Sequence, residues 1–296
     1  MWSKLLRLIG LCCFGGATIA DDSRSLMTSA DLANFSHPPA DVRIHYGDDP
    51  LQFADLRVPE GPGPHPTIVF VHGGCWRAKF GLGYVDELMA ALTRHGFATW
   101  SIEYRRVGDK GGGWPNTFTD VAEGADHLRR IAPKYGLDLD RVIAMGHSAG
   151  GHFALWLAGR ANLLANDPMF SEAPLSLKAV LALAPAPDLM HLHEKQVCDH
   201  IIDKLMGGSP ADYPERYKSS DPVHLSLGDT PQVLVIGRHD SAWAPVGMRY
   251  FNLAEARGDT VRVIDAPESG HFEMVDPQST TWPLVLHATQ SLLETP

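Results

Sequence analysis

The chain has few positive charges and few cysteines for its length. Its 25 lysines and arginines are outnumbered by 35 acidic residues, which gives 296 residues a formal net charge of −10. This balance argues against nucleic acid or an anionic membrane surface as the main partner. No internal repeat or low-complexity tract is present. A hydrophobic fraction of 44% is that of a globular protein with a sizeable core, and the length fits one large α/β domain.

The first twenty residues differ from the rest of the chain. Lys4 and Arg7 precede an apolar run, Leu8–Ile19, which is too short to span a membrane comfortably and ends at Ala20. This layout is typical of a secretory signal peptide. We therefore expect cleavage near Ala20 and an exported protein, periplasmic or secreted, made of residues 21–296 and without a stable membrane anchor.

Only four cysteines are present. Cys12 and Cys13 belong to the predicted signal peptide, where a bulky preceding residue makes lipid attachment a minor alternative. Cys75 and Cys198 could pair in an exported protein. A disulfide at Cys75 would restrain a loop that is predicted below to serve the active site. We therefore favour two free thiols, with pairing as the alternative.

Apolar runs of strand length alternate with runs of helical character. The predicted strands are 42–46, 51–58, 67–71, 97–104, 142–145, 179–184, 233–236 and 261–264, and the predicted helices are 84–95, 118–135, 152–158, 246–257 and 282–293. This alternation predicts an α/β fold, with a mostly parallel central sheet and helices on both faces. Sites in such folds lie beyond the carboxyl ends of the strands.

Residues 186–230 interrupt the alternation with proline, histidine, glycine and charged residues. We interpret this stretch as a small inserted cap over the site. The mature chain, residues 21–296, is then a single domain.

The pentapeptide Gly146-His147-Ser148-Ala149-Gly150 lies between a predicted strand and a predicted helix. Gly-x-Ser-x-Gly in that setting is typical of a nucleophile elbow. The turn is so tight that glycines are needed on both sides of the serine, where a Cβ atom would collide. The hydroxyl then stands at a helix N-terminus, whose N–H groups stabilise a developing anion. Ser148 is therefore the predicted nucleophile, provided that a base, an acid and an oxyanion loop accompany it.

The chain order expected for this topology is serine, acid, histidine. Asp240 follows a predicted strand, and His271 follows the last predicted strand with a glycine before it. Imidazole accepts and returns a proton near neutral pH, so His271 is the predicted base and Asp240 the acid that holds it. Glu268 and Asp276 are rivals of Asp240, but both are too close in sequence to His271 to approach its far ring nitrogen easily.

The segment His72-Gly73-Gly74-Cys75-Trp76 directly follows a buried strand. Glycines there leave backbone N–H groups open to an approaching carbonyl oxygen. The predicted oxyanion donors are the N–H groups of Ala149, Gly74 and Cys75, with Gly73 as a further candidate.

Together these residues resemble an α/β-hydrolase of the esterase/lipase type over roughly residues 42–294. The His-Gly-Gly-x-Trp loop is similar to that of two subgroups, kynurenine formamidase (arylformamidase) and the small bacterial acetyl-xylan and feruloyl esterases. The resemblance implies ester hydrolysis through an acyl-enzyme by Ser148, Asp240 and His271, without a metal or cofactor. The expected substrate is a small-molecule ester or an acylated saccharide, and export favours the esterase over the formamidase, which stays as the alternative.

Three aromatic residues, Trp76, Trp114 and Phe272, are candidates for the substrate pocket, although plain packing is the competing interpretation. His191, His193, Cys198 and His200 have a spacing that metal ligands could use, but no matching second pair accompanies them. We predict no metal site. A binding protein on the same fold would typically lack the nucleophile or the base, and this sequence has both.

Overall fold

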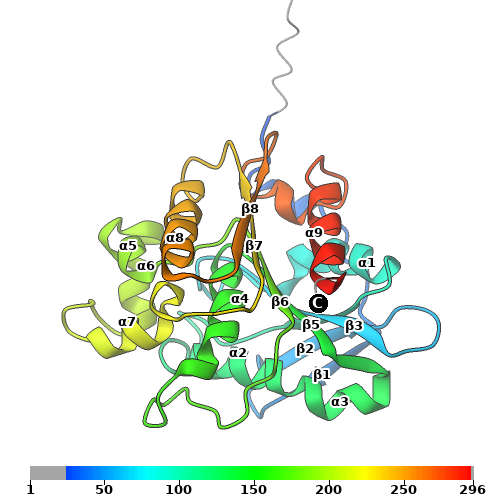
Figure 1. The fold of residues 1–296 in the computed structure, drawn as a ribbon, viewed down its shortest axis with the longest axis horizontal. Helices are drawn as coiled ribbons and strands as arrows, with labels where there is room; N and C mark the ends of the chain where they lie inside the picture. The colour runs from blue at the N-terminus through cyan, green and yellow to red at the C-terminus, as the bar shows by residue number, and fades with distance from the viewer. Residues whose placement is uncertain (1–24, 295–296) are drawn as a thin grey trace, which may run out of the picture.

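The computed structural model describes residues 25–294, so the predicted signal peptide lies outside the described residues. One sheet organises this part of the chain (Figure 1). Its strands are β1 (Val42–His45), β2 (Phe53–Arg57), β3 (His65–Val71), β4 (Ala98–Ile102), β5 (Leu137–His147), β6 (Ala179–Leu183), β7 (Gln232–Gly237) and β8 (Val261–Ala266). Their order is β1-β2-β4-β3-β5-β6-β7-β8. Pairing is antiparallel from β1 to β2 and from β2 to β4, and parallel for the other neighbours.

Helices cover both faces of the sheet, which confirms the predicted fold class. One face carries α1 (Asp86–Arg94) and α9 (Trp282–Glu294), and the other carries α2 (Asn116–Asp126), α3 (Leu128–Tyr135), α4 (Ala149–Gly159) and α8 (Ala244–Arg257). Short 3₁₀ helices lie in the connections: η1 (Asp31–Asn34), η2 (Leu82–Val85), η3 (Arg160–Asn162), η4 (Pro222–His224) and η5 (Glu273–Val275).

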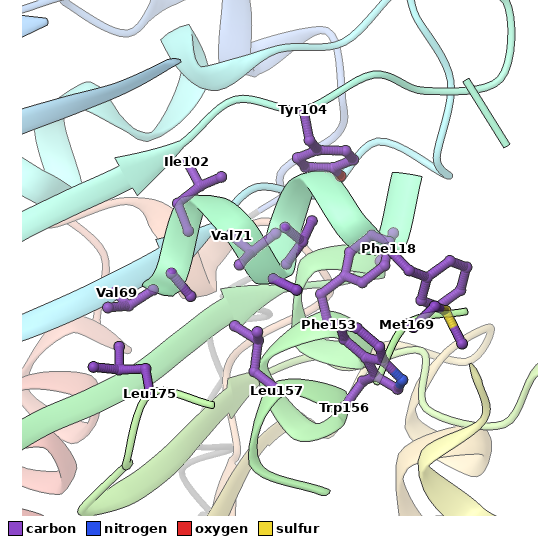
Figure 2. Packing of buried hydrophobic residues seen from close by; sticks show 14 of the residues in the cluster. Val69, Val71, Ile102, Tyr104, Phe118, Phe153, Trp156, Leu157, Met169 and Leu175 are labelled. Carbon is purple, nitrogen blue, oxygen red and sulfur yellow. The ribbon is translucent and has the colours of Figure 1, made fainter. Parts of the chain in front are cut away.

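The central strand β3 shows why the sheet needs both layers. Its side chains alternate, so Ile68 and Phe70 enter the core under α1 and α9 while Val69 and Val71 enter the core under α2 and α4. Figure 2 shows the second core, where Phe118, Phe153 and Trp156 pack together. Each side chain fully buried in this way contributes about 1.5–3 kcal/mol. The hydrophobic cores on the two faces of the sheet hold the strands in place, and with them the strand ends that carry the site.

Most elements lie within a few residues of their predicted bounds, and two depart from them more clearly. The predicted helix 118–135 is divided between α2 and α3, because the Arg130 N–H bonds to the carbonyl of His127 in a tightened turn and Pro133 offers no N–H to the helix. Strand β5 starts at Leu137 instead of residue 142, because its first residues pair with His65 and Pro66 at the start of β3.

The stretch between β6 and β7 forms α5 (Leu189–Glu194), α6 (Val197–Met206) and α7 (Pro214–Ser220). A disulfide joins Cys198 of α6 to Cys75, so the prediction of two free thiols was wrong. The fold brings the Cα atoms of these residues, 123 positions apart in the chain, to 6.4 Å, which is within disulfide reach. Across residues 25–294, no helix has the length and apolar character to cross a membrane.

Candidate active site

Ser148 lies between the end of β5 and the start of α4, with φ 57° and ψ −120°. The glycines around it are required by close packing of the backbone. A Cβ atom on Gly146 would lie 2.1 Å from the carbonyl oxygen of Gly150, and one on Gly150 would lie 2.0 Å from that of Val71. The turn therefore has the backbone strain expected of a nucleophile elbow.

His271 and Asp240 come together from the loops that follow β8 and β7. The Nδ1 atom of His271 lies 2.6 Å from Oδ2 of Asp240, and the other carboxylate oxygen accepts the N–H of Trp243 at 3.1 Å. The Trp243 ring stacks on the His271 ring, with centroids 5.6 Å apart. Among the described residues, neither Glu268 nor Asp276 hydrogen-bonds to this ring. Asp240 therefore holds and orients the imidazole.

Ser148 and His271 line one pocket of about 220 Å³. Its other walls come from the N-terminal segment, the loop after β3, η2, the end of β5 and the loops after β7 and β8. The residues are Ser29, Leu32, Gly74, Cys75, Phe80, Tyr84, His147, Trp243 and Phe272. The Ser148 hydroxyl makes no hydrogen bond to His271 within residues 25–294. Such contacts often tighten only when a substrate is bound.

The loop after β3 contributes Gly74 and Cys75 to the wall of this pocket. Gly74 has φ 113°, and a Cβ atom there would lie 2.4 Å from Cβ of Phe80. The N–H groups of Gly74 and Cys75 have no hydrogen-bond partner among the described residues, and Ala149 opens α4, where N–H groups lack helical acceptors. Gly73 differs from the prediction, because its N–H donates to the Tyr84 hydroxyl at 2.6 Å.

A buried ionic cluster supports the same loop. His72 Nε2 lies 3.0 Å from Oε1 of Glu103, and Arg106 lies 2.9 Å from that oxygen. Burial raises the pKa of Glu103, but His72 and Arg106 outweigh burial and hold the pKa below its ordinary value. The carboxylate is thus kept charged and anchors the start of the loop.

The three predicted pocket aromatics are found in different surroundings. Phe272 lines the pocket beside His271. Trp76 is fully buried in the core, edge-on to His152 at 5.5 Å, and Trp114 lines a separate cavity of about 430 Å³ with Arg216 over its ring. The predictions for Trp76 and Trp114 therefore need correction, because neither residue lines the pocket of Ser148. The backbone of Trp76 has a positive φ (54°), and its side chain is packed in the core.

Residues that the sequence reasoning did not select also line the pocket. Tyr84 and His147 hydrogen-bond to each other at 3.1 Å, and Ser29 and Leu32 precede residue 42, where the first predicted strand begins. None of the described pocket-lining residues comes from 186–230. This stretch contacts the loop after β3 through the disulfide between Cys198 and Cys75. The position of His147 next to Ser148 was the one available sequence signal.

No group of three or more metal-ligating side chains is assembled in the part of the chain that the structure describes. Within the histidine cluster, His193 bonds to Asp203 at 2.5 Å and Cys198 is in the disulfide.

Comparison with known proteins places the chain in a family. The BD-FAE family model matches residues 55–246, more than half of the chain. Esterase LipC of Mycobacterium tuberculosis is 29% identical over 260 residues, covering 79% of this chain and 60% of LipC. Esterase LipQ of the same organism is 26% identical over 214 residues, covering 70% of this chain and 50% of LipQ. The chain therefore spans little more than half the length of these relatives.

Solved structures agree on the fold. Esterase B from Lactobacillus rhamnosis superposes with a TM-score of 0.75 at 20% identity, over 90% of each chain. A truncated carbohydrate esterase from gut microbiota superposes with a TM-score of 0.72 at 21% identity, over 87% of this chain and 99% of that chain. With its sheet order and its helical layers, the chain is an α/β-hydrolase of the esterase/lipase type and belongs to the BD-FAE family.

Proposed function

We propose that the protein is a serine carboxylesterase in which Ser148 is the nucleophile, His271 the base and Asp240 the orienting acid. One observation carries the proposal: the 2.6 Å contact between Asp240 and His271 is made beside a serine held at positive φ in the same pocket. The esterase names of the relatives agree with this activity.

The reaction proceeds in two halves through an acyl-enzyme. Ser148 Oγ attacks the ester carbon while His271 Nε2 takes the hydroxyl proton, and Asp240 holds the imidazolium through Nδ1–H. The N–H groups of Gly74, Cys75 and Ala149 stabilise the oxyanion, each worth about 3 kcal/mol in the transition state. His271 then protonates the leaving alcohol, and water repeats the sequence on the acyl-enzyme.

The size of the pocket favours a short acyl group. At about 220 Å³, the pocket is smaller than the roughly 300–1,000 Å³ typical of sites for drug-sized ligands. One structural neighbour is a truncated carbohydrate esterase from gut microbiota, and another is a bifunctional GH43-CE protein of Bacteroides eggerthii. We therefore propose small-molecule esters as substrates, and acylated saccharides as the class to test first.

The test compares Ser148→Ala with the unchanged enzyme on p-nitrophenyl acetate, acetylated xylan and N-formylkynurenine. We expect kcat/KM for the ester to fall by about 10⁴-fold or more, whereas Ser101→Ala, a buried serine outside the pocket, keeps full activity. Undiminished turnover by Ser148→Ala would reject the assignment. A higher kcat/KM for N-formylkynurenine than for any ester would make the protein a formamidase.

We also propose that the protein works outside the cytoplasm after removal of residues 1–20. The Cys75–Cys198 disulfide supports export, because disulfides persist in oxidising compartments. Intact mass of the native protein is expected to correspond to a chain that begins near Asp21. Finding the full-length chain, reduced and in the cytosol, would contradict the proposal.

A further inference from the structure

Three hydrogen bonds form a continuous path from the loop after β3 to the loop that carries His271. The N–H of Gly73 donates to the Tyr84 hydroxyl at 2.6 Å, that hydroxyl lies 3.1 Å from Nδ1 of His147, and Nε2 of His147 lies 2.9 Å from the carbonyl oxygen of His271. Tyr84 belongs to η2, and His147 ends β5. The path therefore joins three separate parts of the pocket wall.

Elementary chemistry fixes the direction of every bond in the path. A carbonyl oxygen only accepts, so Nε2 of His147 must carry the ring proton. Nδ1 of the neutral ring is then an acceptor, and the Tyr84 hydroxyl must donate to it. That leaves a lone pair on the hydroxyl oxygen for the Gly73 N–H. Only one tautomer of His147 satisfies all three contacts.

The surroundings of His147 keep its ring in this neutral form. Burial, with the neighbouring His271 ring next in importance, lowers the pKa of His147 to about 3. The groups that face it are Tyr84 from η2 and His271 and Phe272 from the loop after β8. Burial likewise raises the pKa of Tyr84, so its hydroxyl keeps the proton that it donates.

We infer that Tyr84 and His147 are positioning residues that hold the oxyanion loop and the loop of the base at a fixed separation around Ser148. The inference rests on the proposed function. It gives Gly73 a part other than that of an oxyanion donor, because its N–H is engaged by Tyr84. A Cβ atom on Gly73 would lie 2.6 Å from the His147 carbonyl oxygen, so the loop already touches the elbow at this point.

The path from Gly73 through Tyr84 and His147 to His271 forms a bridge between two loops. This bridge matters because the oxyanion donors and the base must be placed together. Each neutral hydrogen bond makes only a small net contribution to the stability of the fold. A displacement of about 1 Å in a catalytic arrangement can cost as much as 10²-fold in rate. Loss of the bridge should therefore lower turnover far more than it lowers folding stability.

The first test is Tyr84→Phe, which removes one oxygen and keeps the ring. We expect kcat on p-nitrophenyl acetate to fall by about 10- to 100-fold while KM changes by less than about threefold. Tyr217→Phe is the matched control, because the hydroxyl of this buried tyrosine also makes a hydrogen bond, donating to the carbonyl of Gly208 in the α7 region. It should keep the unchanged kcat. A Tyr84→Phe enzyme with kcat within about twofold of the parent would overturn the inference.

A double variant tests whether the two residues act through one path. In His147→Gln the amide can still donate to the His271 carbonyl, but it offers no acceptor at the Nδ1 position. Adding Tyr84→Phe should then lower kcat by no more than about threefold beyond the larger single effect. If the decreases in kcat of the two single variants multiplied in the double variant, the two residues would act independently and the bridge would be rejected.

Nitrogen NMR of histidine in the resting protein gives a readout that does not need turnover. We expect His147, identified by the signal lost in His147→Gln, to be the Nε2–H tautomer, with its Nδ1 resonance shifted in Tyr84→Phe. An Nδ1–H tautomer, or resonances that Tyr84→Phe leaves in place, would overturn the bridge. Absence of ester turnover by the parent enzyme would instead reject the proposed function, so the two failures are distinguishable.

Discussion

Ser148 has a backbone conformation that residues with a side chain rarely adopt. Its φ is 57° and its ψ is −120°, and it lies in the pocket wall at the start of α4. Conformations of this kind cost on the order of 1–3 kcal/mol. The carbonyls of Val71 and Gly150 pack against the two elbow glycines, so neither glycine position admits a side chain.

Because of this strain, we expect a glycine at position 148 to give a more stable protein than an alanine. Ser148→Gly should unfold at higher urea concentration than Ser148→Ala, with a free energy of unfolding greater by about 1 kcal/mol, because glycine adopts positive φ without a steric penalty. Both variants should be inactive, so Ser148→Ala is the control for loss of the hydroxyl alone. Equal stability of the two would show that the turn stores no strain at this residue.

Much of the site could be predicted at the scale of residues. The order serine, acid, histidine along alternating strands and helices selected Ser148, Asp240 and His271, and the structure brings all three to one end of the sheet. The engagement of Gly73 could not be predicted, because it depends on where η2 places the hydroxyl of Tyr84. The core position of Trp76 was missed for a similar reason, since backbone dihedrals set the direction of that side chain.

The N-terminal segment is the element whose role the sequence concealed. No helix or strand was predicted between the signal peptide and residue 42, yet η1 places Leu32 in the pocket wall. Glu273 anchors the segment, since its carboxylate accepts the N–H of Met27 at 2.6 Å and that of Gly270 at 2.9 Å. One side chain therefore ties this wall to the loop that carries His271.

Trimming the wall should extend the range of acyl chains. With Leu32→Ala we expect kcat/KM for p-nitrophenyl hexanoate, relative to the acetate, to rise by about tenfold, because each newly accommodated methylene contributes up to about 0.8 kcal/mol. Leu26→Ala removes the same atoms from the same segment outside this pocket and serves as the control. An unchanged chain-length profile in Leu32→Ala would mean that the acyl group does not reach this wall.

Every strand of the sheet was predicted, although the start of β5 was not, whereas one predicted helix is divided in two. Strands buried on both faces, such as β3 and β6, appear in the sequence as continuous apolar runs. The division between α2 and α3 depends on a single turn at His127, which an amphipathic pattern does not encode. Likewise, the pairing of Cys75 with Cys198 depends on the three-dimensional path of the chain.

At the scale of the whole molecule, α4 couples the site to the core. It begins at the elbow, and its residues Phe153 and Trp156 lie in the core shown in Figure 2. On the same helix His152 is fully buried, and its Nε2 donates to the carbonyl of Ser220 at 2.9 Å. Burial lowers the pKa of His152 to about 3. The folded state therefore binds a proton at this ring less readily than the unfolded chain does.

Because the folded state binds this proton less readily, lowering the pH destabilises the folded protein over a defined pH range. The contribution of His152 to the free energy of unfolding is fully present above the unfolded pKa of 6.5. It decreases by up to about 1.4 kcal/mol per pH unit as the pH falls from there toward about 3. His152→Gln keeps a donor for Ser220, so its free energy of unfolding, measured with urea between pH 7 and pH 4, should decline less steeply. Asp221, whose pKa is raised by burial and by Asp188, acts in the opposite sense but is common to both proteins. Equal slopes would contradict this account.

The central claim is that Ser148 carries the acyl group, and covalent labelling tests it most directly. The protein is treated with a fluorophosphonate, its intact mass is measured, and the adduct is located by peptide mapping, with Ser148→Ala treated in parallel. We predict one adduct per chain, confined to the peptide that contains Ser148 and lost in Ser148→Ala. An adduct on another residue, or the absence of any adduct from a folded enzyme that hydrolyses esters, would contradict the account.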